Sequence, residues 1–303
     1  MLKHTAVSLL CVAFPLASAA QEADGDALPS PPTQAASASQ PVSHDEPESA
    51  PTSVPASAPA PILEPTPAPS PEQQRAAQIE QLLAEIDHLY KLRMKKGNTE
   101  ASYEKAKEVL ALDGQSYEAQ WRIARTAYWI ADGSEDKQLK EKWGKIGLEA
   151  GTAGVELKPG RVEAQFWGAA SLGHYAKGVG VMKAFWDGLG KRYEKWVRKA
   201  MQMNPKYAWG GPARALGRYY FTLPGIAGGD NAKAIKYLEE SKRIAPEALR
   251  TRAWLAEVYL DEGERAKAKV ELEFCMSAEL KQGDLADNLR MQPECERLQK
   301  KLQ

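Results

Sequence analysis

The chain has 303 residues, and its 40 Lys and Arg side chains balance 40 Asp and Glu side chains, so its formal net charge at pH 7 is zero. A chain without net charge has no bulk field to attract nucleic acid or an anionic membrane, and we expect neither as a partner. Apolar residues make up 43% of the chain, as in a globular protein, but thirteen of the twenty prolines lie between Pro29 and Pro71. This uneven distribution predicts a domain boundary.

The first twenty residues are typical of a secretory signal peptide. Lys3 precedes an apolar stretch over about residues 6–16, and small residues follow at 17–20. The stretch is shorter than the roughly 20 residues of a membrane span, although an uncleaved anchor is the alternative. Cys11 follows a leucine, where a lipoprotein signal needs a small residue, so we expect no lipid attachment. The sequence therefore predicts export to the periplasm.

Residues 21–71 form an acidic leader of Pro, Ala and Ser without Lys or Arg. Such a composition buries too little apolar surface to offset the entropy of ordering, which predicts a disordered, extended spacer. It either tethers the folded part at a distance from a surface or is a solvated leader without a specific role.

Residues 72–303 predict an all-α domain. Apolar residues recur at intervals of three and four, as between Ile79 and Tyr90, and no alternating strand pattern is present. Similar helix-turn-helix segments follow turns at 112–114, 157–159, 203–205 and 244–246. Their spacing of roughly 41 to 46 residues exceeds the ~34 of a tetratricopeptide unit. We therefore predict a tetratricopeptide-like solenoid of elongated repeats with a C-terminal capping helix over about residues 285–302.

Glycines and insertions indicate how the repeats pack. Gly147, Gly151 and Gly154 share one helical face at a cost of about 1 kcal/mol each in helix propensity, which predicts close approach of a neighbouring helix. The extra length of the repeats falls at residues 132–141, 177–191 and 223–229. Insertions on one side of a solenoid are expected to shape a binding face or an oligomer contact.

The most distinctive stretch covers residues 207–230, YAWGGPARALGRYYFTLPGIAGGD. Its glycines and first proline predict the start of a helix, the Leu-Pro-Gly run predicts the end, and Asp230 is suited to cap the next helix. Helical spacing separates two faces. The expected packing face carries Leu216, Gly217 and Tyr220, and the candidate binding face carries Arg214, Arg218 and Phe221.

The first helix of each unit lines the concave surface of such a solenoid. The candidate ligand- or partner-binding residues on this surface are Trp121, Arg125, Tyr128, Phe166, His174, Arg214, Arg218 and Phe221, followed along the chain by Glu257 and Asp261. Aromatic rings with arginines suit a small anionic or amphipathic ligand, or an extended peptide with a carboxylate. Alternatively, the rings pack between repeats and the arginines form intramolecular ion pairs.

No motif predicts catalysis. The chain has no Cys/His spacing typical of zinc, no nucleophile motif and no phosphate or dinucleotide loop, so we expect no enzyme, no metal site and no cofactor. Cys275 and Cys295 are the two cysteines outside the signal peptide. In an oxidising compartment this pair favours a disulfide that fixes the C-terminal helix, and two buried free thiols are the alternative.

The segment GGPARALGRYYFTLPGIAGGD, followed by KAIKYLEESKRIAP, resembles the T-component family of TRAP transporters. The resemblance covers roughly residues 100–278. It implies a periplasmic, non-enzymatic, tetratricopeptide-like protein that works beside a TRAP substrate-binding protein and assembles as a trimer with a ligand-accessible pore. The missing lipoprotein motif and the acidic leader depart from the family pattern.

The sequence thus predicts an exported helical-repeat binding or scaffold protein. Through its concave face it would engage the substrate-binding protein of a TRAP-type transporter or a small anionic or amphipathic ligand. The alternative is a cell-envelope assembly adaptor that binds peptide segments of partner proteins.

Overall fold

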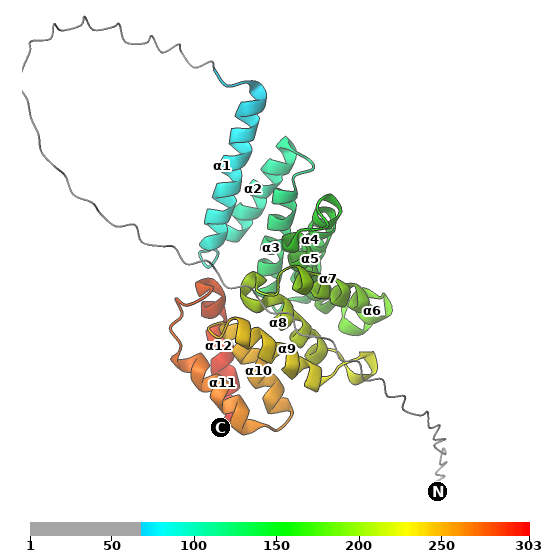
Figure 1. Ribbon diagram of the computed structural model, residues 1–303, viewed down its shortest axis with the longest axis vertical. Coiled ribbons are helices and arrows are strands. Elements are labelled where there is room, and N and C mark those ends of the chain that lie inside the picture. The colour runs from blue at the N-terminus through cyan, green and yellow to red at the C-terminus, as the bar shows by residue number, and fades with distance from the viewer. Residues whose placement is uncertain (1–67) are drawn as a thin grey trace, which may run out of the picture. The chain divides into compact units, whose positions relative to one another are not determined.

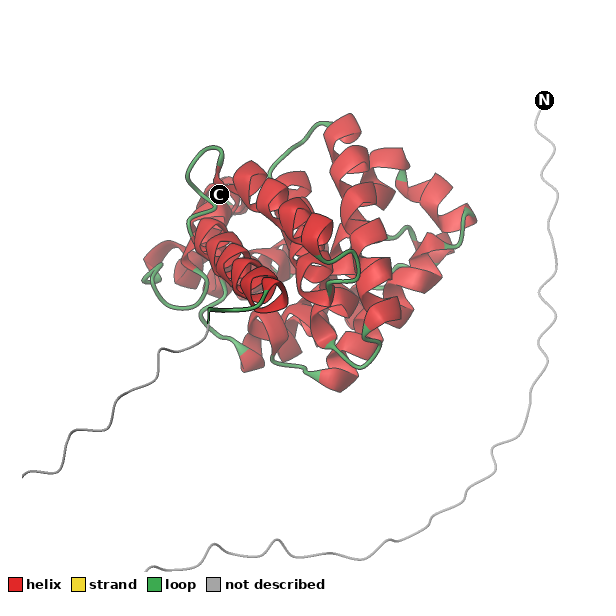
Figure 2. Ribbon diagram, turned by 90° about the horizontal axis from the view of Figure 1, so that it is seen from above, coloured by secondary structure: helices red, strands yellow, loops and turns green. Residues whose placement is uncertain are grey.

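The computed structural model describes residues 68–303, and every regular element in this part is helical (Figures 1 and 2). The predicted all-α, tetratricopeptide-like architecture is confirmed, whereas the signal peptide and nearly all of the leader lie outside the described residues. None of the helices in this part is long and apolar enough to cross a membrane. The helices are α1 (Pro71–Lys91), α2 (Asn98–Leu112), α3 (Tyr117–Asp132), α4 (Lys137–Leu157), α5 (Val162–Val179), α6 (Val181–Trp186), α7 (Leu189–Met203), α8 (Tyr207–Thr222), α9 (Asn231–Ile244), α10 (Leu249–Asp261), α11 (Arg265–Ser277) and α12 (Leu285–Leu302), with a short 3-10 turn η1 (Gly225–Ala227).

The helices pack as consecutive pairs, α1/α2, α3/α4, α5/α7, α8/α9 and α10/α11, and α12 covers the last pair (Figure 1). The predicted insertion at 177–191 contains the end of α5, the short helix α6 and the start of α7. Trp186 of α6 and Ile226 of η1 leave 76% and 86% of their surfaces exposed. Two of the expected insertions therefore carry large apolar side chains on the outside.

Side-chain caps set several helix starts where the sequence indicates them. The hydroxyl of Ser70 accepts the backbone N–H of Gln73 in a capping box that begins α1. The carboxylate of Asp230 accepts the N–H of Lys233 and begins α9 as predicted. The C-terminal helix runs from Leu285 to Leu302, and the sequence predicted about residues 285–302.

The three glycines of α4 let α5 approach closely. A Cβ atom on Gly151 would lie 2.3 Å from the Cα of Gly168, and one on Gly154 would lie 2.6 Å from the Cβ of Ala164. Gly147 is similarly close to Ser171. The expectation of a close helix–helix contact is confirmed, and the lost helix propensity is offset by dispersion contacts between the two backbones.

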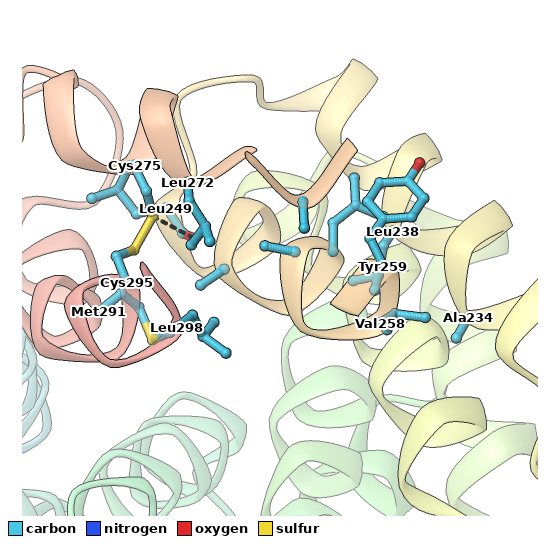
Figure 3. Close-up of a cluster of buried hydrophobic side chains, with 14 of the residues drawn as sticks. Ala234, Leu238, Leu249, Val258, Tyr259, Leu272, Cys275, Met291, Cys295 and Leu298 are labelled. Carbon is cyan, nitrogen blue, oxygen red and sulfur yellow. Dashed lines mark hydrogen bonds between the residues drawn. A yellow bond between two sulfur atoms is a disulfide. The ribbon is translucent and has the colours of Figure 1, made fainter. Parts of the chain in front are cut away.

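A disulfide joins Cys275 of α11 to Cys295 of α12, with 6.1 Å between their Cα atoms. Figure 3 shows it inside the largest apolar cluster, beside Leu249, Leu272 and Leu298. The bond and the surrounding side chains hold α12 on the last repeat. In this position, α12 also places some of its side chains against earlier repeats.

Gly151→Ala is expected to lower the free energy of unfolding by at least about 1 kcal/mol, because the new methyl group forces two backbones apart. The loss should persist although alanine contributes up to about 1 kcal/mol of helix propensity. Urea unfolding measures the change. Gly160→Ala is the matched control, since a Cβ atom there meets nothing within 4 Å. Equal stability of the two variants would contradict the close contact.

Candidate functional site

The first helices of the pairs enclose two cavities. The large cavity, of about 640 Å³, is bounded by α1, α3, α5, the start of α8 and the start of α12. The small cavity, of about 130 Å³, is bounded by α3, α5, α6, α7, α8 and α10. Tyr128, Phe166 and Arg214 line both cavities and form the wall that they share.

Seven of the eight predicted binding residues line these cavities. Trp121 and Arg125 line the large cavity, and His174 and Arg218 line the small one, in addition to the three residues of the shared wall. Their role in binding stays a prediction.

Three other residues expected on this surface lie outside both linings. Phe221 packs against the core of the last repeats, with its ring 5.4 Å from the guanidinium carbon of Arg218. Glu257 forms an ion pair with Arg218, and Asp261 accepts a hydrogen bond from Asn231. Phe221 therefore belongs to the packing of the solenoid rather than to the cavity surface.

The three arginines differ in their partners. Arg125 forms an ion pair of 2.7 Å with Asp87, and Arg218 pairs with Glu257. Arg214 has no carboxylate partner among residues 68–303, and its guanidinium donates to the carbonyl oxygens of Trp209 at 2.9 Å and Ala208 at 3.2 Å. The intramolecular ion pairs named as the alternative therefore exist for Arg125 and Arg218 but not for Arg214.

Arg214 stabilises a left-handed turn at the start of α8. Ala208, Trp209 and Gly210 have φ values of 49°, 54° and 68°. A non-glycine residue in this region costs of order 1–3 kcal/mol, which the surrounding structure must offset. Arg214 donates to the carbonyl oxygens of Ala208 and Trp209, and the Ser241 hydroxyl donates to that of Gly210 at 3.1 Å. These hydrogen bonds supply part of the compensation. The turn places Trp209, which is 43% exposed, at the large cavity.

Aromatic side chains dominate the large cavity. Trp167 donates its indole N–H to the hydroxyl of Tyr207 at 2.7 Å, and Trp121 donates to Glu118 at 2.8 Å, so both rings are held in place. Other rings of the lining are those of Tyr90, Tyr128, Trp129, Phe166 and Trp209. A preformed cavity of this size with fixed rings and a few charged groups is typical of a binding site.

A buried ion cluster joins the second helix pair to the last pair and α12, and no pattern in the sequence indicated it. Arg250 of α10 lies 2.8 Å from the Asp132 carboxylate at the end of α3 and 2.6 Å from the Asp287 carboxylate of α12. Arg290 of α12 approaches Asp132 at 3.3 Å. Asp132 was expected only as part of an insertion, and of its partners only His174 was among the candidate residues. The cluster closes the solenoid around the cavities.

The cluster shifts the pKa of its carboxylates in the stabilising direction. Burial alone would raise the pKa of Asp132, but the Arg250 charge and the bonds from His174 and Arg250 hold it well below its usual value. Burial likewise raises the pKa of Asp287, but the charge and hydrogen bonds of Arg250 outweigh it, so this pKa is also lowered. A carboxylate with a lowered pKa stabilises the folded chain above its unfolded pKa of about 4, and this contribution is lost as the pH falls below that value.

Lys177 is a partly buried cation of the small cavity without an ion-pair partner in the described part of the chain. Burial, and then the charge of Arg218, lower its pKa to about 8, although Asp132 acts in the opposite direction. Burial also lowers the pKa of His174, whose Nε2 is 3.5 Å from Asp132 and whose buried Nδ1 has no hydrogen-bond partner within residues 68–303. The small cavity thus contains polar groups that the chain itself does not satisfy.

Comparison with known proteins supports the fold but not the resemblance to the TRAP T-component family. A family model described as "Regulator of microtubule dynamics protein 1-3" matches residues 82–227, slightly less than half of the chain. No protein with a curated description matches. The structure is similar to TTC0263, a thermophilic TPR protein of Thermus thermophilus, with 21% identity and a TM-score of 0.53 over 71% of this chain and 98% of that one.

Two further solved structures have lower TM-scores. PilF of Pseudomonas aeruginosa has a TM-score of 0.45 and 17% identity, over 76% of this chain and 91% of its own. MamA has a TM-score of 0.40 and 18% identity, over 69% and 95% respectively. At these identities the likeness concerns the fold alone.

The resemblance to the TRAP T-component family is wrong as an assignment. The matching family model includes most of the segment that carried the resemblance, and it describes another family. The expected TRAP partner and the expected trimer rested on this resemblance and are withdrawn with it. A tetratricopeptide-like repeat reuses the same small and aromatic residues in many families, so such a segment identifies the repeat better than the family.

Arg250→Met is expected to lower the free energy of unfolding by about 3–5 kcal/mol at pH 7, because it leaves two buried carboxylates without their main counter-charge. The deficit should shrink at pH 5, since a buried carboxylate without its partner has a raised pKa and takes up a proton. Urea unfolding at both pH values measures it. Arg297→Met, at an exposed ion pair of α12, should change stability by less than about 1 kcal/mol. A deficit independent of pH would contradict the proposed role of the charge.

Lys177→Met is expected to stabilise the chain at pH 7 by up to about 3 kcal/mol, because it removes a buried charge whose pKa is lowered. The sign follows from proton binding. Between pH 8 and about 10.4 the unfolded chain holds more protons on Lys177 than the folded chain, so the wild type gains stability as the pH rises through this range. The difference between wild type and Lys177→Met should therefore vanish toward pH 10. Lys191→Met, an exposed lysine, is the control for thermal unfolding across this range.

Proposed function

We propose that this protein is an exported, non-catalytic scaffold that holds an extended peptide segment of a partner protein in the large cavity. The observation that carries the proposal is the set of fixed aromatic rings around a cavity of about 640 Å³ in the face enclosed by the repeats. Helical repeats commonly use this face for extended partners. A peptide-binding adaptor was the alternative hypothesis from the sequence, behind a transporter component or a small-ligand binder.

The charges of the large cavity indicate the composition of the segment. Arg214 has no carboxylate partner in the described residues, whereas Arg93 and Arg125 form ion pairs with Asp284 and Asp87. Aromatic faces contact apolar and proline side chains, and the N–H groups of an unpaired guanidinium donate to carboxylates or backbone carbonyls. We therefore expect an apolar segment with at least one acidic group.

Export is supported by two independent observations. The first twenty residues have the pattern of a signal peptide, and a disulfide in the folded part suits an oxidising compartment such as the periplasm. Detection of the mature chain in a periplasmic extract, with its N-terminus near residue 21 by mass spectrometry, tests this part of the proposal.

Trp209→Gly provides the sharpest test of the peptide site. The substitution removes a ring of the large cavity, and glycine adopts the left-handed conformation at this position without strain. A peptide selected from a random library against the mature wild-type chain should bind the variant at least about tenfold more weakly, as expected for an aromatic anchor. Fluorescence anisotropy measures the affinity.

Ala208→Gly is the matched control, because it relaxes the same turn and leaves the ring in place. Its affinity for the selected peptide should stay within about twofold of the wild type. The proposal is wrong if no peptide binds more tightly than about 100 μM, or if the two variants bind the peptide equally.

A further inference from the structure

The small cavity combines apolar walls with an excess of positive charge. Lys177, Arg214 and Arg218 line it, and the one carboxylate of its lining, Asp132, is already paired with Arg250 and Arg290. Arg218 has a counter-ion in Glu257, whereas Lys177 and Arg214 have none among residues 68–303. Two partly buried cations therefore line this cavity without an ion-pair partner from the described part of the chain.

Uncompensated buried charge is costly, and a protein that retains it has a use for it or a partner that neutralises it. The carbonyl oxygens that Arg214 contacts use only part of the five N–H donors of a guanidinium. These observations indicate an anion that the cavity receives from outside the chain.

The size and walls of the cavity restrict the rest of the ligand. Its volume of about 130 Å³ is close to that of an engineered apolar cavity of about 150 Å³ that binds benzene. Aromatic rings from six helices line it, among them those of Phe166, Phe185, Tyr193 and Trp254. The space therefore accommodates a single ring or a short aliphatic group, and it is too small for a peptide segment or a long acyl chain.

We propose that the small cavity binds a small monocarboxylate whose apolar body is about the size of one ring. Its carboxylate lies against Lys177 and Arg214, and its body lies among the aromatic side chains. This site goes beyond the peptide site of the large cavity, with which it shares Tyr128, Phe166 and Arg214, and its test requires no bound peptide.

Titration of the mature chain with benzoate by isothermal calorimetry tests the proposal, with benzyl alcohol as a neutral ligand of the same shape and inorganic phosphate as an anion without an apolar body. Benzoate should bind with a dissociation constant below about 1 mM, and the other two ligands at least about tenfold more weakly. The proposal is overturned if benzoate does not bind at about 10 mM, if benzyl alcohol binds as well, or if phosphate binds as well.

Lys177→Met tests whether benzoate binds in the small cavity rather than elsewhere on the protein. The variant keeps the fold because it removes an unpaired charge, and it should weaken benzoate binding at least about tenfold without weakening that of benzyl alcohol. Lys191→Met, whose lysine is exposed and outside the cavity lining, should leave both affinities unchanged. Unchanged benzoate binding by Lys177→Met would overturn the assignment. A peptide that still binds while benzoate does not would leave the large-cavity proposal intact.

The pH dependence gives an independent readout. Lys177 faces Arg218 of α8, Asp132 of α3, Lys140 of α4 and Arg250 of α10, and with a pKa of about 8 it must be protonated to hold the carboxylate. Benzoate affinity should fall roughly tenfold between pH 7.5 and pH 9 in the wild type, and it should be flat over this range in Lys177→Met. A flat wild-type profile would show that Lys177 does not contact the anion.

Discussion

The placement of Arg250 between Asp132 and Asp287 is the constraint on which the rest of the site depends. The three side chains come from α10, α3 and α12, which are far apart along the chain. An open solenoid would leave these groups in water at little cost. Once they are buried together, each carboxylate needs the guanidinium, and the helix that carries it cannot move away without exposing an unpaired charge. The last repeat is thereby held against the first ones, and the face between them contains the two cavities.

Several features around these cavities are unfavourable for folding. Lys177 is partly buried without a counter-ion in the described part of the chain, and Ala208 and Trp209 adopt a left-handed backbone. Each of these features costs free energy that packing elsewhere must offset, such as the glycine contact of α4 and α5. Departures from good local design gather at functional sites in natural proteins. Their concentration at both cavities is a stronger argument for binding than the residue types alone.

The fold was predictable because its signals are local. Helical spacing, the glycine face of α4, the Asp230 cap and the extent of α12 all depend on residues within a few turns of one another. The register of the repeats also placed seven binding candidates at the cavities. The ion cluster was not predictable, because Arg250 and Asp132 are separated by 118 residues and each resembles an ordinary charge near a helix end. The spacing of apolar residues along single helices does not indicate whether the first and last repeats of a superhelix contact each other. Phe221 was expected on the binding surface, but its ring packs against the core of the last repeats, because the helix face that it shares with Arg218 also contacts the next repeat.

The shared wall makes the two cavities dependent on each other. Arg214 contributes to both, and the same guanidinium holds the left-handed turn that positions Trp209 at the large cavity. If the two proposed ligands both contact Arg214, occupancy of one cavity changes the affinity of the other, and the two effects on binding free energy are equal by reciprocity. Arg214 and the left-handed turn that it holds are the part of the shared wall through which such an effect would pass.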